Sequence, residues 1–574
     1  MSPHIGSGMG MRLEERMDTR MEERMEMQQI PQLSPNIRRP PGNRFRRERI
    51  RHFTTQRLQA LLRRGADEIT VDKALATFLQ RIERIMPFDD YFFDPEAHAR
   101  FLRGEIPDAV YLNHASIGTP CAAAVEKGRH ALTIEQQLLR EGDPGLAQAL
   151  SVELARKLRE KLAVMLKVDP SGIILTRNIG EAAVMAAALA GVYSRRSDEG
   201  PVAFADPTHI STMVNMLLVS DPGNVYGRDP FSTFPTHFRE RGPQYKEDEL
   251  RRWLGQDAFT IFAIRGKTRK QIQKEVMTHV KPCNPKAIVL PHVLRETGDE
   301  LPIEEIGLHM QEHLWHASII ADGAQAVGNI DIDAGKLLGV HAPRPAVDFY
   351  LGGLHKAIGA PPMGFVAFDE RRDTGHEGLE RLRCGWAKNN LLILHGMFDH
   401  SLHVPTTVED SLSTGDLYGA LAQLEQLECA RHICDLRDGP RMSVYFLMHE
   451  RFRRREAFQK LLETRFGERW TGKDALQFIK PIHKATSLIL TFRFPTVDMR
   501  TLTERLSKQG IFLTYTESYD AIRASFSPDN NDEQLRHCVE AMAREVKQME
   551  REGPTVRVQE EGRPPKSGSI DELS

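Results

Sequence analysis

The stretch "DFYLGGLHKAIGAPPMGF", residues 348–365, places one lysine between a histidine and a turn rich in glycine and proline. Its first residues form an apolar run that predicts a buried strand. Lys356 follows that strand among small and apolar residues, whereas a solvated lysine usually has polar neighbours. Gly352, Gly353 and Gly359 allow another group to approach the backbone closely. We therefore expect Lys356 to lie in a functional site.

Short apolar runs alternate with helical stretches from about residue 105 to residue 405. This alternation is typical of an α/β fold in which a mostly parallel sheet is covered by helices. Strands buried on both faces read as continuous apolar runs. The candidates are 172–178, 201–206, 286–293, 317–323 and 347–353. Functional residues of such sheets lie beyond the carboxyl ends of the strands.

Two further strand ends carry residues suited to binding a charged ligand. After 172–178 a helix begins near Glu181, and its first amides and positive dipole end form a potential anion site, although an ordinary strand-to-helix turn would look the same. Asp322 ends the run 317–323, where a buried carboxylate needs a cationic partner or a role as a helix cap.

An anion site, a carboxylate and a lysine at neighbouring strand ends match the needs of pyridoxal 5'-phosphate (PLP). The phosphate would bind the helix N-terminus, and the carboxylate would keep the pyridine nitrogen protonated. The lysine amine would form a Schiff base, and partial burial would favour its neutral form. We therefore predict PLP as the cofactor.

Several blocks resemble the class V aminotransferase-like enzymes of PLP fold type I. These blocks are "YLNHASIGTP", "TRNIGEAA", "DPTHIST", "HVLRETGDELPIEEI", "DGAQAVGNIDID", "LSTGDLYGAL", "AIRASFSPDNNDEQL" and the stretch around Lys356, and together they span roughly residues 85–550. The family includes cysteine desulfurases, kynureninases and isopenicillin N epimerase-like proteins, and the pattern is nearest to the last. The resemblance implies a large domain with a mostly parallel sheet between helices, followed by a smaller C-terminal α+β domain.

The resemblance also implies roles for individual residues. Lys356 would be the Schiff-base lysine and a proton carrier, Asp322 the partner of the pyridine nitrogen, and His209 a catalytic residue that stacks on the cofactor ring. Other cofactor-binding positions would be Ile179, Gly180, Gln325, His355 and Thr414, with Thr414 reaching in from the neighbouring subunit of a homodimer. The substrate-binding positions would be Arg523, as a carboxylate clamp, together with Arg295 and Asn113.

The sequence departs from the family at two phosphate-binding positions. Gly353 and Gly180 stand where many relatives carry hydroxyl residues. We expect backbone groups, His355 or an arginine to compensate, and Arg177 and Arg295 are the candidates.

The expected domain boundaries follow from composition and from the resemblance. We expect disordered tails at 1–72 and 552–574, a helical segment at 73–108 that packs on the small domain, a large domain at 109–410, and a linking helix with the small domain at 411–551. The first tail is rich in arginine and is either a solvated tail, a handle for an acidic partner or, with a start at Met27, a targeting peptide. The stretch 218–285 looks like an insertion that is either a lid or a surface loop.

Composition excludes several other classes of protein. The 574 residues carry a net charge of -2, which gives no general attraction to nucleic acid or to a membrane. The six cysteines form no CxxC pair, which argues against a zinc site and a disulfide framework and favours a reducing cytoplasm. The apolar run 182–193 is too short to span a bilayer. We predict neither a metal site nor a membrane segment.

These observations predict an enzyme that acts on an amino acid or a similar amine through a Schiff base and abstraction of the alpha proton. Epimerisation, transamination and elimination all begin in this way. A cysteine desulfurase is disfavoured, because Cys429 and Cys434 lie in a helical stretch and not on a loop. The alternative from another class is a non-catalytic scaffold that is recruited through its basic tail.

Overall fold

The computed structural model describes residues 110–552, except for 193–199, 210–211, 214, 218–258, 370, 372–411, 434–438, 468–475, 487 and 529. The side chains of 122 and 426–447 also lie outside the description. All described residues belong to one compact unit, Phe88–Ser574. The predicted N-terminal tail, the segment 73–108, Met27 and residues 553–574 lie outside the described residues, so the statements about them stay predictions.

A seven-stranded sheet forms the centre of the chain. Its strands run in the order β2-β9-β8-β7-β5-β3-β4. Neighbouring strands are parallel except at β9, which is antiparallel to both β2 and β8. The bounds are β2 (Ile173–Thr176), β3 (Val202–Asp206), β4 (Phe259–Ala263), β5 (Ala287–Pro291), β7 (Ser318–Asp322), β8 (Phe349–Gly353) and β9 (Gly364–Phe368). The five predicted strands are thus confirmed, and so is the α/β class with a mostly parallel sheet.

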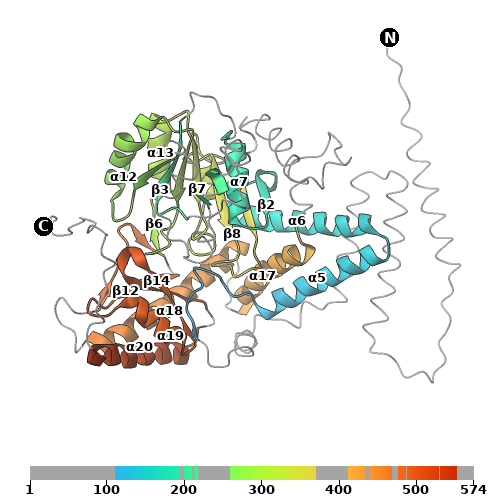
Figure 1. Ribbon diagram of the computed structural model, residues 1–574. Coiled ribbons are helices and arrows are strands. Elements are labelled where there is room, and N and C mark those ends of the chain that lie inside the picture. The colour runs from blue at the N-terminus through green and yellow to red at the C-terminus, as the bar shows by residue number, and fades with distance from the viewer. Residues whose placement is uncertain are drawn as a thin grey trace, which may run out of the picture. The chain divides into compact units, whose positions relative to one another are not determined.

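Helices cover both faces of this sheet. Figure 1 shows α12 (Arg269–Glu275) and α13 (Ile303–His313) on one side of the strands and α7 (Ile179–Leu189) on the other. Five alanines of α7 are buried in the same core cluster as Val289, Ile320 and other strand residues. Small side chains let this helix lie close to the sheet, so its first turn stands directly beyond the end of β2.

Two long helices, α5 (Ala122–Arg140) and α6 (Pro144–Leu166), form an antiparallel pair. Asp143 accepts a hydrogen bond from Leu146 N and so caps α6, while Gly142 adopts the positive φ that the short connection requires. The helix α17 (Thr414–Ile433) packs against both.

A second, antiparallel sheet lies near the C-terminus, in the order β10-β12-β15-β14. Its strands are β10 (Gln477–Phe478), β12 (Ile489–Arg493), β15 (Ala521–Ser525) and β14 (Thr514–Thr516), and α18 (Gly439–Gly467), α19 (Met499–Ser507) and α20 (Asp532–Glu552) pack with it. Phe458, Phe492 and Phe526 lie in its own core. The predicted α+β arrangement is confirmed, whereas the boundaries between domains stay predictions.

Short elements complete the described part. The strand β1 (Val110–Tyr111) pairs with β13 (Ile511–Phe512), and β6 (Asp299–Glu300) pairs with β11 (Lys484–Ala485). The short helical segments are η2 (Pro170–Gly172), η3 (Val276–Val280), η4 (Lys281–Cys283), α14 (Ala334–Leu337) and η5 (Glu517–Tyr519).

The expected insertion at 218–285 needs a correction. Its last part is not a loop, because Phe259–Ala263 forms the edge strand β4 and Arg269–Glu275 forms α12. Aromatic and β-branched residues in "FTIFA" favour a strand, and only its two phenylalanines are buried, which fits a strand at the edge of the sheet. Residues 218–258 lie outside the described part, and their role as a lid stays untested.

None of the described helices combines the length and the apolar character that a membrane crossing requires.

Candidate active site

Lys356 lies in a tight turn directly after β8. Leu354 N donates to Met363 O (2.9 Å), and Gly359 N donates to Lys356 O (2.9 Å). From a distant part of the chain, Gly118 N donates to His355 O (2.7 Å). A Cβ atom on Gly118 would stand 1.9 Å from Lys356 O, so this position requires glycine. The backbone of Lys356 is therefore fixed from two sides.

The amine of Lys356 is buried and lacks a hydrogen bond to any described residue. Only 8% of the residue is exposed. Burial lowers the pKa of Lys356 to about 8; Asp322 opposes this shift, and Arg523 and Arg295 add to it. A substantial fraction of the amine is therefore neutral near physiological pH, which is the nucleophilic form.

Asp322 lies at the carboxyl end of β7, beside Leu351 of β8. Its Oδ2 accepts a hydrogen bond from Thr212 Oγ1 (3.0 Å), and its Oδ1 accepts one from Ala324 N (3.0 Å). The carboxylate is thus held by one side chain and one amide. Its cationic neighbour is Lys356, whose pKa it influences.

Two predicted histidines lie within electrostatic reach of Lys356, and both are neutral at physiological pH. Burial lowers the pKa of His209 to about 3, and Lys356, Arg295, Arg523 and His355 lower it as well. Burial and Lys356 lower the pKa of His355 to about 4. The backbone of Met363 opposes this shift. The Nδ1 atom of His355 is buried and forms no side-chain hydrogen bond in the described part of the chain.

The N-terminus of α7 presents two amides that no described residue satisfies. Asn178 caps the helix by accepting a hydrogen bond from Glu181 N (3.0 Å). The amides of Ile179 and Gly180 belong to the first turn, which has no intrahelical acceptors, and no bond to another described residue satisfies them. Both residues are buried. This arrangement suits an anion.

Arg177 does not point its guanidinium into this anion site. Its guanidinium pairs with Glu181 (Nη2 to Oε1, 2.8 Å) and is largely exposed. The expectation that Arg177 replaces a phosphate hydroxyl therefore receives no support from its placement.

Arg523 extends from β15 into a cage of neutral oxygen atoms. Nη1 donates to Arg295 O (2.9 Å), and Nη2 donates to Ser116 Oγ (2.7 Å), Asn113 Oδ1 (3.2 Å) and Thr514 Oγ1 (3.2 Å). The Nε atom is buried without a partner, and no described acid lies within ion-pair distance. Burial and Arg295 lower the pKa of Arg523 to about 10. Glu296 opposes this shift from beyond ion-pair distance. A buried cation that pairs with no described acid is poised to bind an anion.

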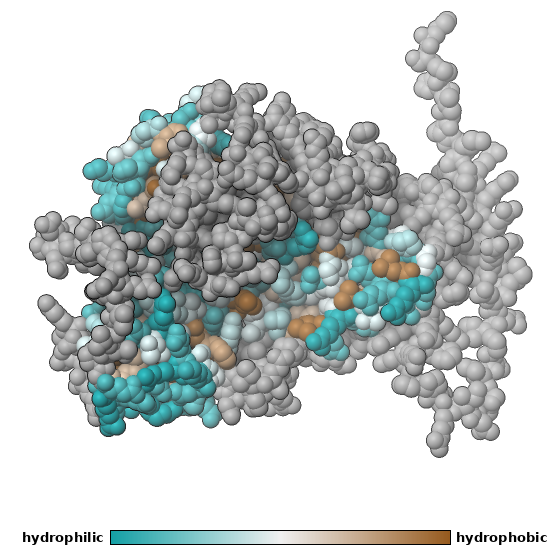
Figure 2. Space-filling view, viewed as in Figure 1, coloured by the Kyte–Doolittle hydropathy of each residue, from teal (hydrophilic) through white to brown (hydrophobic). Residues whose placement is uncertain are grey.

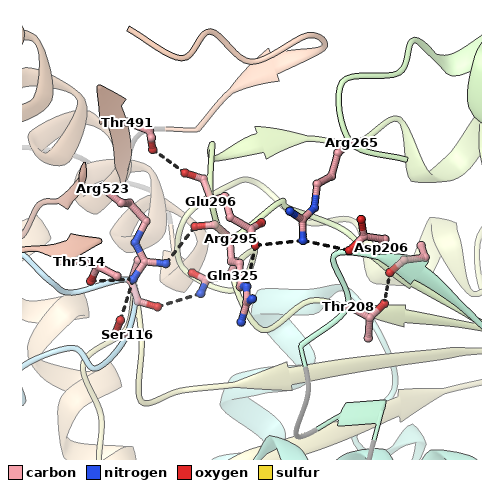
Figure 3. Close-up of polar contacts among 12 residues, drawn as sticks. Ser116, Asp206, Thr208, Arg265, Arg295, Glu296, Gln325, Thr491, Thr514 and Arg523 are labelled. Carbon is pink, nitrogen blue, oxygen red and sulfur yellow. Dashed lines mark hydrogen bonds and ion pairs between the residues drawn. The ribbon is translucent and has the colours of Figure 1, made fainter. Parts of the chain in front are cut away.

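A chain of alternating charges lies beside Arg523. Arg295 Nε pairs with Glu296 Oε1 (3.0 Å), and Arg265 Nη2 lies 2.9 Å from Asp206 Oδ1 and 3.7 Å from Glu296 Oε1. Figure 3 shows Arg523 with Ser116 and Thr514 on one side, Arg265 with Asp206 on the other, and Arg295 and Glu296 between them. Glu296 thus fixes Arg295 close to Arg523.

Gln325 and Asn113 both join the site to the loop that contains Gly118. Gln325 Nε2 donates to Ala115 O (2.8 Å), while its Oε1 is buried and has no partner among the described residues. Asn113 Oδ1 accepts from Arg523 and from Thr514 Oγ1. The predicted contact of Gln325 with the cofactor would use its second amide hydrogen.

Thr414 is fully enclosed by its own chain, and its Oγ1 has no hydrogen-bond partner in the described part. It lies at the start of α17, where the next residue, Gly415, packs against Gly128 of α5. The predicted reach of Thr414 into the active site of a second subunit stays a prediction, and its burial does not favour that role.

Sequence reasoning missed the residues that support the predicted ones. These are Thr212 on Asp322, Ser116 and Thr514 on Arg523, and Glu296, Arg265 and Asp206 around Arg295. These side chains lie up to 407 positions from the residues they support, so spacing alone could not pair them. Signals were present for four of them, because the quoted blocks "YLNHASIGTP", "DPTHIST" and "HVLRETGDELPIEEI" contain Ser116, Asp206, Thr212 and Glu296. No quoted block contains Thr514 or Arg265.

Comparisons with known proteins relate the chain to others through its fold. The sequence matches no protein-family model and no curated protein. Among solved structures, a C-DES mutant with glycine covalently linked to the PLP cofactor gives a TM-score of 0.52 at 17% identity, over 77% of this chain and 98% of that chain. The apo cysteine desulfurase of Thermococcus onnurineus NA1 gives 0.52 at 16%, over 78% and 98%.

The Escherichia coli cysteine desulfurase CsdA, in its S-sulfonic acid form, gives a TM-score of 0.50 at 17% identity, over 80% of this chain and all of that chain. At these identities the likeness establishes a shared fold. The predicted fold, which is that of fold type I PLP enzymes, is confirmed.

Proposed function

We propose that this chain is a PLP-dependent enzyme of the class V aminotransferase type that acts on an amino acid or a similar amine. The observation that carries the proposal is the buried amine of Lys356, which lacks a hydrogen-bond partner in the described part and has a pKa of about 8. A structural lysine would be paired or solvated. A lysine that forms a Schiff base needs a neutral, accessible amine.

The surrounding residues fit the other parts of PLP. The unpartnered amides of Ile179 and Gly180 suit its phosphate, and Asp322 would hold a proton on the pyridine nitrogen. The neutral imidazole of His209 would lie against the ring without adding a charge, and the unpartnered Nδ1 of His355 offers a further polar contact. Bound PLP would supply an electron sink for a carbanion at the alpha carbon of the substrate.

The chain would contribute the positioning and the proton transfer. Arg523 would hold the carboxylate of the substrate. This carboxylate would replace the neutral oxygen atoms that now accept hydrogen bonds from the guanidinium. Lys356, once its amine is free, would accept the alpha proton and return it to the same or to another atom. Arg295 and Asn113 would contact the substrate beside Arg523, and Glu296 would fix the direction of Arg295.

The step after proton abstraction stays open between epimerisation, transamination and elimination. We do not assign the activity of the cysteine desulfurases that share the fold. Among the described cysteines, Cys121 and Cys538 are buried, burial raises the pKa of the Cys538 thiol, and the Cys283 thiol donates to His279 O (3.2 Å). Cys384, Cys434 and the Cys429 side chain lie outside the described part.

The first test is the identification of the lysine that binds PLP. We expect the purified chain to take up PLP with a visible absorbance band, and borohydride reduction to fix the cofactor on the peptide that contains Lys356. Lys356→Ala should remove both signals. Lys336→Ala is the matched control, because Lys336 is exposed and pairs with Glu304 (2.8 Å) away from the site.

Two outcomes would contradict the proposal. Attachment of PLP to a different lysine would overturn the assignment of the site. The absence of any PLP band from folded wild-type protein would instead favour the non-catalytic scaffold.

A further inference from the structure

The last turn of α13 gathers three metal-binding side chains on one face. His309, Glu312 and His313 each offer one ligand atom, and these atoms lie within 4.8 Å of one another. The residues are spaced i, i+3 and i+4, which places them side by side on a helix. The two imidazole rings meet edge to face, with centroids 4.5 Å apart and an interplanar angle of 78°.

None of these three side chains forms a hydrogen bond or an ion pair with another described residue. The Nε2 atom of His309 is shielded from solvent and has no partner in that part of the chain. A shielded nitrogen without a partner carries a desolvation penalty, which a ligand would relieve. The carboxylate of Glu312 is exposed and available.

We propose that His309, Glu312 and His313 bind one divalent transition-metal ion such as Zn²⁺. Imidazole nitrogen favours zinc, nickel and copper, whereas magnesium and calcium prefer sites made of oxygen ligands alone. Tetrahedral zinc with bonds of about 2.0–2.1 Å holds its ligands roughly 3.3 Å apart. The three side chains would rotate to bring their ligand atoms from within 4.8 Å to this spacing, and water would complete the coordination.

The position of the cluster in the fold favours a cation. His313 is the last residue of α13, so the cluster lies at the negative end of the helix dipole. The chain passes from this point through 314–317 into β7, the strand that ends at Asp322. A bound ion would stabilise the last turn of α13, just before β7 begins.

This site is separate from the proposed PLP site. Its residues lie before the amino end of β7, while Asp322 lies at the carboxyl end of the same strand. The pattern of cysteines, taken alone, predicted no metal site. The spacing H-x-x-E-H in residues 309–313, which is also found in zinc-binding helices, was the available signal.

The test is calorimetric titration of the untagged chain with Zn²⁺, after PLP has been bound and the excess removed, so that free phosphate groups do not compete. We expect one ion per chain. His309→Gln and His313→Gln should each weaken binding by at least about tenfold, and Glu312→Gln should weaken it less, because the two imidazoles remain. Titration with Mg²⁺ should give no binding.

His316→Gln is the matched control, because it removes an exposed imidazole three residues beyond the cluster and should leave Zn²⁺ binding unchanged. Lys356→Ala should also bind Zn²⁺ normally, which separates this proposal from the PLP assignment. Circular dichroism checks that the variants are folded. No heat of binding with wild-type protein, or equal affinity in a His309→Gln/His313→Gln double variant, would overturn the proposal.

Discussion

Lys356 owes its unusual chemistry to neighbours that act in opposite directions. Burial, Arg523 and Arg295 disfavour its charged form, and Asp322 favours that form. Burial is the largest of these influences, so the pKa falls from the ordinary lysine value to about 8. The charged neighbours then raise or lower the pKa around this value, and each of them can be tested by a single substitution.

The pH dependence of PLP capture is the first prediction. The reactive form of Lys356 is the neutral amine, so the rate at which apoprotein gains its visible band should rise with pH and level off above about 8. An ordinary lysine would continue to gain reactivity toward pH 10. Stopped-flow absorbance measures this profile.

Two variants should move the midpoint in opposite directions. Arg295→Gln removes a cation and should raise it, whereas Asp322→Asn removes an anion and should lower it. A wild-type rate that still increases near pH 10 would show that the Lys356 amine is solvated.

Arg523 should distinguish a substrate carboxylate from other ligands. Lysine keeps the positive charge but cannot form two parallel hydrogen bonds to a carboxylate. For an amino-acid substrate, Arg523→Lys should therefore lower kcat/KM on the order of a hundredfold, mainly through KM. The visible spectrum of the PLP-bound enzyme should not change, because Arg523 would contact substrate and not cofactor.

Ser116→Ala provides a graded comparison, because it removes one neutral acceptor from Arg523 and leaves the guanidinium in place. Its effect should be smaller than that of Arg523→Lys. Unchanged kinetics of Arg523→Lys with an amino-acid substrate would show that Arg523 does not bind the substrate carboxylate. Arg295 would then be the next candidate for that role.

Single residues were predictable where the chemistry requires one residue type at a strand end. Lys356 and Asp322 lie where the apolar runs before them had indicated, and their proximity follows from the neighbouring strands β8 and β7. Arg177 was a poor candidate, because it precedes α7 and pairs with Glu181 in the first turn of that helix. That pairing is visible only once the helix register is known.

Among the elements, the loop that carries Gly118 decides whether the lysine turn is held in place. Gly118 packs directly on the carbonyl of Lys356, and Ala115 on the same loop accepts from Gln325. Arg451 of α18 holds the turn from another side, through hydrogen bonds to Gly328 O (2.6 Å) and to Ala357 O. Segments from both ends of the described chain thus converge on Lys356.

Gly118→Ala should impair PLP binding without unfolding the chain. An added methyl group has no room beside Lys356 O and must push the loop away, at a cost of about 1–3 kcal/mol. We expect weaker PLP binding and a lower melting temperature. Gly467→Ala is the control, because a Cβ atom there would meet no atom within 4 Å. Wild-type affinity for PLP in Gly118→Ala would show that the loop does not hold the lysine turn.

The main sheet was largely predictable because its strands are buried on both faces and read as continuous apolar runs. The edge strand β4 was missed, since it is only partly buried and follows a long stretch that gave no strand signal. The antiparallel strand β9 was not predicted separately either. It belongs to the same apolar, glycine-containing stretch as Lys356, and only the pairing with β2 and β8 reveals its direction.

At the scale of the whole molecule, the exposed surface of helices α5 and α6 is a candidate interface for the predicted homodimer. Leu132 (40% exposed) and Leu139 (52% exposed) are seven positions apart on α5, which places them on one stripe of the helix. Val152 and Val164 of α6 are also exposed. Figure 2 shows apolar residues over these helices among hydrophilic ones. An apolar stripe of this kind commonly marks a contact with another protein.

We expect this stripe to contact a second copy of the chain, in keeping with the homodimer that the family resemblance implies. Leu132→Glu/Leu139→Glu should shift the protein from dimer to monomer in sedimentation velocity, because two buried carboxylates without partners would oppose association. Ile482→Glu is the control, since Ile482 is an exposed apolar residue outside this stripe. If active sites lie at the subunit interface, the monomeric variant should also lose catalytic activity, and its activity should recover at protein concentrations that restore the dimer. A wild-type chain that sediments as a monomer while binding PLP would show that the site is complete within one chain, and the stripe would then need a different partner.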